Sequence, residues 1–108
     1  MPHKKFFKSG ERIRDLAKGH GACIASDMIT VSGLRVGYMY REEPDDEVDS
    51  GWRFLAGTET DEYMDNPDNH GIYDVNTIAN YDPEIIRFLD APAPCTFKRD
   101  DSGEFVGM

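Results

Sequence analysis

Carboxylates are the most numerous side chains in this sequence that could perform chemistry, and most of them fall in one stretch. Residues 42–74 hold twelve of the 21 Asp and Glu residues and only one basic residue, which gives the stretch a net charge of −11. Carboxylates could act in pairs as a general acid and a general base, or could ligate calcium as a cluster. A surface of this charge could instead attract a basic protein.

The metal-binding possibility fails on spacing. The best alignment with a calcium-binding loop begins at Asn66 rather than Asp, and Thr77 stands where a bidentate Glu is required. Cys23 and Cys95 are far apart in the sequence and form no zinc-binding motif. We therefore expect no metal and no cofactor, and we expect both cysteines to be reduced and partly buried thiols.

Acid–base catalysis has two candidate pairs, Asp45 with Asp49 and Asp61 with Asp65. Such catalysis needs one carboxyl group to be desolvated while the other stays ionised. Both pairs lie in polar segments that we expect to be wet, and no serine or cysteine lies in a nucleophile motif. The residues therefore predict a protein that is not an enzyme.

Aromatic residues gather around the acidic stretch. Tyr and Trp offer large, rigid contact areas and are enriched at the centres of protein interfaces, although the same rings can also serve as core packing. These aromatic residues are Tyr38, Tyr40, Trp52, Phe54, Tyr63, Tyr73 and Tyr81.

We expect a protein-binding surface formed mainly by an exposed loop at residues 42–51 and the segment at 59–68. Both segments are rich in Asp and Glu. The loop also holds Pro and Gly, which interrupt helices and strands. The candidate contact residues are Glu42, Glu43, Asp45, Asp46, Glu47, Asp49, Trp52, Asp61, Glu62 and Tyr63.

A second interpretation is a small enzyme or ligand-binding domain with a pocket beside a helix that begins at Asp82. Asn76, Asn80 and Tyr81 would line this pocket, because amides and phenols orient small polar ligands. The same residues could instead fix the approach of the chain to the helix. A regulatory or oligomer-forming module is a third interpretation.

Composition excludes several classes of partner. The 108 residues hold 12 Lys and Arg against 21 Asp and Glu, for a net charge of −9. This balance argues against binding to nucleic acid and to anionic membranes, both of which depend on basic residues. No apolar run approaches the length of a membrane span or of a signal peptide, so we expect a cytoplasmic protein.

The pattern of residues predicts a single small α+β domain, mostly an antiparallel sheet with two short helices. Residues 1–20 form a basic tail of net charge +4 with a short helix over 9–17, and residues 21–108 form the domain proper. We expect a helical turn at 60–64 and a helix from Asp82. The expected strands are 22–25, 52–56 and 72–75, with hairpins joining 28–31 to 34–41 and 95–99 to 104–106.

Three motifs in order resemble one bacterial family: VGYMYREEP at 36–44, DSGWRF at 49–54 and NTIANYDP at 76–83. This is the immunity protein 33 family, first catalogued as a domain of unknown function and later grouped with the immunity proteins of polymorphic toxin systems. The likeness runs from about Gly21 to Lys98. It implies a cytoplasmic α+β domain that protects its producer by binding a cognate toxin, with no catalytic residues to carry over.

Overall fold

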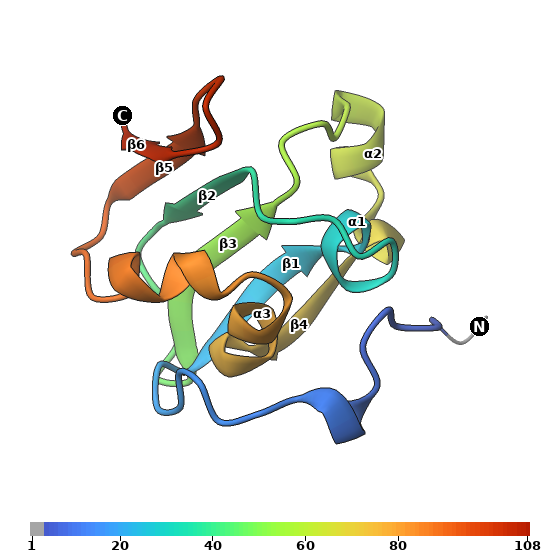
Figure 1. The fold of residues 1–108 in the computed structure, drawn as a ribbon. Helices are drawn as coiled ribbons and strands as arrows, with labels where there is room; N and C mark the ends of the chain where they lie inside the picture. The colour runs from blue at the N-terminus through green and yellow to red at the C-terminus, as the bar shows by residue number, and fades with distance from the viewer. Residues whose placement is uncertain (1–3) are drawn as a thin grey trace.

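Residues 4–108 are described by the structure, a computed structural model. Their six strands form one sheet with the order β4-β1-β3-β2-β5-β6 (Figure 1). β1 and β3 run parallel, and every other neighbouring pair is antiparallel, which confirms the predicted α+β class. The strands are β1 (Ala22–Ser26), β2 (Tyr38–Arg41), β3 (Asp49–Leu55), β4 (His70–Asp74), β5 (Cys95–Arg99) and β6 (Phe105–Gly107).

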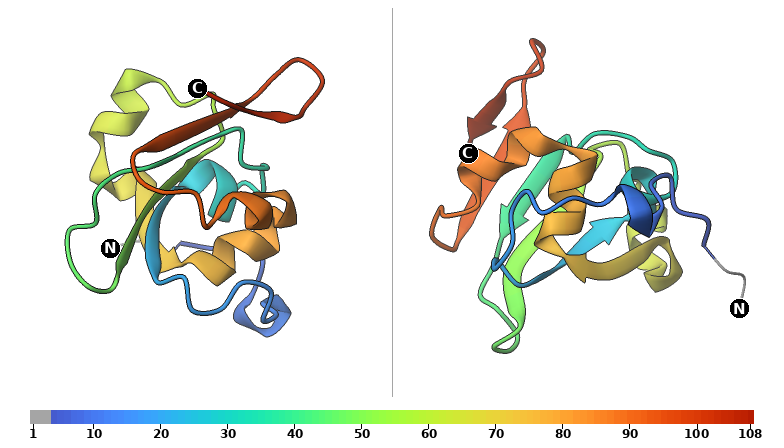
Figure 2. Two further views of the ribbon diagram at one scale, coloured as in Figure 1. Left: turned by 90° about the vertical axis from the view of Figure 1, so that its left-hand side faces the viewer. Right: turned by 60° about the horizontal axis from the view of Figure 1, so that its bottom comes forward.

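All the helices in the described residues are short. Those on one side of the sheet include α3 and η3, whose buried apolar residues close the core (Figures 1 and 2). None of the helices formed by residues 4–108 is long and apolar enough to span a membrane. The α-helices are α1 (Asp27–Thr30), α2 (Asp61–Asp65) and α3 (Val75–Tyr81), and the 3-10 helices are η1 (Gly10–Arg12), η2 (Pro67–Asn69) and η3 (Pro83–Phe88).

The core lies between the sheet and the pair α3 and η3. Alternation along β3 directs Trp52 and Phe54 inward, where their rings stack with centroids 5.9 Å apart, and directs Arg53 to the other face. Phe88 of η3 packs on Phe97 of β5, with ring centroids 4.7 Å apart. Because α3 and η3 cover one face of the sheet, a binding site formed by strand residues has to lie on the opposite face.

The predicted hairpin over residues 28–41 is wrong in its first arm. Ser26 Oγ accepts a hydrogen bond from the Met28 amide and so caps α1, which replaces the expected strand at 28–31. Gly33 adopts a φ of +80°, and the chain then runs without regular structure to β2. The short apolar run at 28–31 fits either kind of element, and the cap favours the helix.

Two helices also differ from expectation. Ser9 makes no side-chain cap, and only the 3-10 turn η1 forms where a helix over 9–17 was expected. Helix α3 was not anticipated at all: Val75, assigned to a strand, is its first residue. Asp82 does cap the next helix by accepting from the Glu84 amide, but that helix, η3, is of the 3-10 type.

The basic N-terminal segment is held against α3 by side-chain amides. Asn76 Oδ1 accepts from the Leu16 and Ala17 amides at 2.7 and 2.8 Å, and Asn80 Oδ1 accepts from the Arg14 amide at 2.8 Å. These bonds satisfy backbone groups that the expected helix would have paired internally. The segment consequently runs along α3 as an extended strap (Figure 2).

Candidate functional site

The face of the sheet turned away from α3 and η3 carries one row of side chains that crosses four strands. Strand register places Ile72 of β4 beside Ile24 of β1, Ile24 beside Arg53 of β3, and Arg53 beside Tyr40 of β2. The Ile72 side chain is 77% exposed. The row is therefore apolar on β4 and β1, and it becomes charged at Arg53 in the middle of the sheet.

Arg53 fastens the loop between β2 and β3, which we call the acidic loop (residues 42–48), to the sheet. Its Nη1 and Nη2 atoms each donate to one carboxylate oxygen of Asp49 at 2.9 Å, and its Nε donates to Glu42 Oε2 at 2.7 Å. The Arg53 side chain is 6% exposed although it lies on the outer face. Of the two carboxylates that bind Arg53, Asp49 is 13% exposed and Glu42 is 52% exposed, and together they tie the start of the loop and the start of β3 to Arg53.

The hydrogen bonds of this cluster shift the pKa values of both partners. The bonds from Arg53 hold the pKa of Asp49 well below its usual range, and the amides of Asp45 and Gly51 lower it further. The bonds to Asp49 and Glu42 raise the pKa of the Arg53 guanidinium despite its burial. Both groups therefore stay charged across the physiological range, and the cluster is suited to holding structure rather than moving protons.

A glycine shapes the start of β3. Gly51 has a φ of +86°, a conformation that favours glycine, and a Cβ there would collide with the Glu42 carbonyl oxygen. The pairing of β1 with β3 is irregular at the same place, between Ala22 and Ile24. This bend lets the acidic loop fold back toward Arg53.

The remaining carboxylates of the acidic loop face solvent. Asp46 Oδ1 accepts from the Val48 and Asp49 amides at 2.9 Å and so stabilises the turn of the loop. Glu43 and Glu47 are exposed and have no recorded bond in the described residues. They are the carboxylates of the loop most available to a partner.

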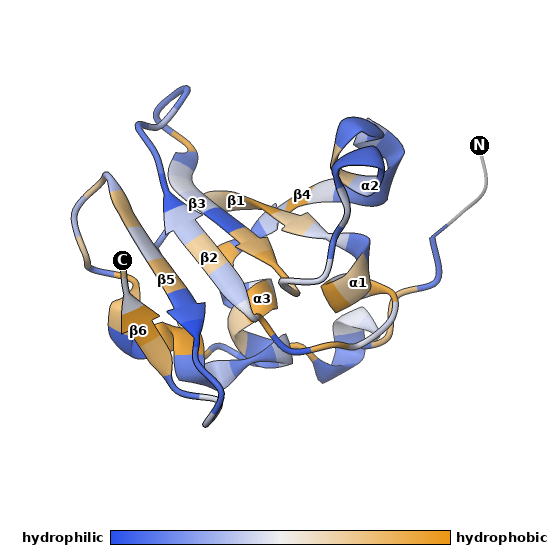
Figure 3. Cartoon of the chain, turned by 90° about the horizontal axis from the view of Figure 1, so that it is seen from above, coloured by the Kyte–Doolittle hydropathy of each residue, from blue (hydrophilic) through white to orange (hydrophobic). Residues whose placement is uncertain are grey.

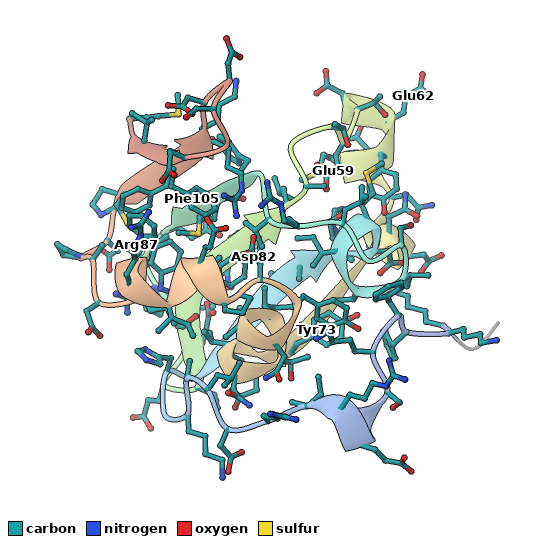
Figure 4. The ribbon with its side chains drawn as sticks, in the orientation of Figure 1. Glu59, Glu62, Tyr73, Asp82, Arg87 and Phe105 are labelled. Carbon is teal, nitrogen blue, oxygen red and sulfur yellow. The ribbon has the colours of Figure 1, made fainter. Side chains whose placement is uncertain are left out.

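Helix α2 carries the second acidic segment. Thr60 caps it by accepting from the Tyr63 amide at 3.1 Å, which confirms the predicted helical turn. Asp61 and Glu62 are exposed, and Glu62 points away from the body of the protein (Figure 4). Tyr63 is half-buried and packs edge-on against His70, with ring centroids 5.9 Å apart.

The acidic loop comes before β3 and α2 comes after it, so the two segments lie at opposite ends of this strand. Both rise on the side of the sheet away from α3, with β1 and β4 between them (Figure 3). A hollow of about 330 Å³ lies beside the loop, and another of about 610 Å³ lies beside α2. Ile24 and Ile72 line both hollows. We call the continuous surface formed by these two hollows the trough.

Trp52 is the one predicted contact residue that the structure removes from the surface. Its side chain is fully buried, and the indole Nε1 donates to the Leu89 carbonyl at 3.2 Å. Its inward direction follows from strand alternation next to the outward Arg53. Trp52 therefore serves the core and not a partner.

The side chains expected beside the Asp82 helix are engaged elsewhere. Asn76 and Asn80 bind the backbone of the N-terminal strap, and the Tyr81 hydroxyl accepts from the Lys8 amide at 3.0 Å and donates to the Thr30 carbonyl at 2.9 Å. They do not line the hollow beside η3. That hollow is lined by Pro83, Glu84, Ile86, Arg87 and Glu104.

Groups for metal chemistry or covalent chemistry do not come together in the part of the chain that is described. Among residues 4–108, no three His, Cys, Asp or Glu side chains converge as a metal site. Cys23 and Cys95 are free thiols, and burial raises the pKa of Cys23, which keeps it protonated and unreactive. The arrangement on the open face is suited to binding.

Sequence reasoning missed the two features that organise this face. Arg53 is the one basic residue between positions 42 and 74, and it alternates with buried aromatic residues in a strand. That combination could have indicated an outward cation that gathers the carboxylates around it. Ile24 and Ile72 lie in short strands, and nothing in the sequence indicates that their side chains face outward together.

Comparisons with known proteins give one result. Neither the curated proteins nor the solved structures include a match to this chain. The family model of the immunity protein Imm33 domain matches residues 23–108, which covers the sheet except for Ala22, the first residue of β1, and does not include residues 1–22. The chain therefore belongs to the Imm33 immunity protein family.

Proposed function

We propose that this protein neutralises a basic cognate toxin in the cytoplasm by binding it, without catalysis, through the acidic loop and α2. Membership of an immunity protein family supports a toxin as the partner. The observation that carries the choice of surface is the exposure of the carboxylates on both segments, on one side of the sheet.

The predicted contact residues divide into two groups under this proposal. Glu43, Glu47, Asp61 and Glu62 are exposed and would meet the toxin directly. The others include Glu42 and Asp49, which bind Arg53 and would act by holding the loop in place.

Charge gives this surface a kinetic advantage. Twelve carboxylates within residues 42–74 make a concentrated negative field, and such fields raise the rate at which a basic partner associates. The acidic loop is fixed by Arg53 before binding, so less loop entropy is lost on association. Many toxins that attack nucleic acid are basic where they contact phosphate, which fits this field.

The test is a double charge reversal, Glu43→Lys with Glu47→Lys, assayed against the purified domain of the cognate toxin. The matched control is Glu11→Lys with Asp101→Lys, which changes the net charge equally at exposed sites away from the acidic loop. We expect the loop variant to associate at least about tenfold more slowly at low salt, and the control to change by less than about threefold.

Protection of toxin-expressing cells is measured with the same variants. If both variants slowed association with the toxin equally, the effect would be one of net charge alone. The acidic loop would then not be part of the interface. A toxin that binds this protein with unchanged kinetics in both variants would contradict the electrostatic part of the proposal.

A further inference from the structure

The two acidic segments do not form one continuous patch, because an apolar floor separates them. Val48 ends the acidic loop with 68% of its side chain exposed, Ile72 lies in the middle of β4 with 77% exposed, and Met64 of α2 is 37% exposed. The hollow beside the loop is lined by Val48 and Ile72, and the hollow beside α2 by Met64 and Ile72. Ile72 thus occupies the centre of the trough.

Carboxylates border this floor at both ends. Asp45 and Asp46 line the trough on the side of the loop, and Asp65 lines it on the side of α2. An apolar centre within a charged rim is the usual anatomy of a protein interface, and clustered exposed apolar side chains on a small domain mark interaction sites.

We propose that the trough receives an apolar side chain of the toxin that is flanked on both sides by basic side chains. This inference rests on the proposed function and deepens it, since it names the chemistry of the segment that binds. The apolar side chain packs on Ile72 and Ile24, while the basic side chains reach the carboxylates of the loop and of α2.

Charge complementarity selects this occupant over a second copy of the chain. A symmetric dimer through the trough would place the acidic loop and α2 of one copy against the same segments of the other. Like charges brought together in this way are repulsive. Two basic residues line the trough: Arg53 already binds Asp49 and Glu42, and a single histidine, His70, does not balance the carboxylates of both segments.

The experiment uses nuclear magnetic resonance titrations of the full isotope-labelled chain with two synthetic peptides. One peptide places a leucine between two pairs of lysines, and the other places a serine at the same position. Both carry the same charge, so the difference between them isolates the apolar contact. We expect the leucine peptide to bind more tightly and to shift the amide signals of Ile24 and Ile72.

Two matched variants of the protein locate the contact. Ile72→Thr keeps a β-branched residue at an exposed position of the edge strand β4, and Val106→Thr makes the same kind of change on the other edge strand, β6, where Val106 is 48% exposed. We expect Ile72→Thr to weaken binding of the leucine peptide about fivefold, because an ethyl group leaves the contact. Val106→Thr should leave binding within about a factor of two.

Three results would each overturn the inference. The peptides could bind with equal affinity, the two variants could behave alike, or the Ile72 signal could move with protein concentration in the absence of peptide, which would identify a second copy as the occupant. Failure of the proposed function is distinguishable, because it appears as unimpeded killing of cells by the toxin under test, whatever the peptides do.

Discussion

Replacing Arg53 by methionine tests whether one cation organises the acidic loop. Methionine keeps most of the length of the aliphatic chain and removes the guanidinium. The change breaks the paired hydrogen bonds to Asp49 and the bond to Glu42, all of which measure 2.7 to 2.9 Å. Asp49, whose side chain is 13% exposed, then becomes a largely buried carboxylate without its partner cation.

The expected cost follows from that burial. Removing one partner of a buried ion pair destabilises a protein by about 3–5 kcal/mol, because the remaining charge is left uncompensated. Domains of this size are stable by about 5–15 kcal/mol, so the loss is a large fraction of the total. Arg53→Lys keeps the charge but loses the forked geometry, and should cost about 1.5–3 kcal/mol for one charge-assisted hydrogen bond.

Urea unfolding followed by tryptophan fluorescence measures these changes directly. Trp52 is the one tryptophan of the sequence, and it is fully buried and adjacent to Arg53 in β3. Its emission therefore reports on the core directly beneath the Arg53 cluster. Loosening of the loop is measured separately by hydrogen exchange of the Ala22 amide, which donates to the Val48 carbonyl at 2.7 Å. We expect the Ala22 amide to exchange faster in Arg53→Met than in the wild type, and at urea concentrations below those that unfold the whole domain.

A double-mutant cycle with Asp49→Asn separates the ion pair from other effects of the substitutions. The double variant should be less destabilised than the sum of the two single variants by about 1–3 kcal/mol. A loss below about 1 kcal/mol in Arg53→Met, or additive losses in the cycle, would refute the reasoning that this cluster holds the loop.

Two further predictions concern the strap and the response to acid. Asn76→Ala should release the Leu16 and Ala17 amides, cost about 1–3 kcal/mol, and speed tryptic cleavage of the strap in a limited-proteolysis time course. Because the pKa of Asp49 is lower in the folded state than in the unfolded state, its stabilising contribution is complete above about pH 5 and is lost as the pH falls further. The difference in the free energy of unfolding between wild type and Asp49→Asn should therefore shrink between about pH 5 and pH 2, and a constant difference would contradict this assignment.

Local signals in the sequence were sufficient for several elements. Alternation of Trp52 and Phe54 with polar neighbours predicted a strand with one buried face, and β3 has that face. Turn residues predicted the C-terminal hairpin of β5 and β6, and Thr60 predicted the start of α2. In each case the residues that predict the element lie within it or within a few residues of it.

The missed features depend on partners far along the chain. Helix α3 begins directly after β4 with no intervening turn, so its N-cap, Asp74, was read as the strand's own residue. The extended strap depends on Asn76 and Asn80, whose side-chain amides bind strap backbone that lies 59 to 66 positions earlier. The trough depends on the pairing of Ile24 with Ile72, which the linear pattern does not encode.

The strap has a consequence for the order in which the chain assembles. Synthesis proceeds from the N-terminus, so Leu16 leaves the ribosome 60 residues before Asn76, the side chain that holds it. Throughout that interval the basic segment has no docking site, and its lysines and arginines keep it hydrated. The earliest part of the described chain to be made consequently cannot dock until α3 has been made, and α3 follows β1, β3 and β4 in the sequence.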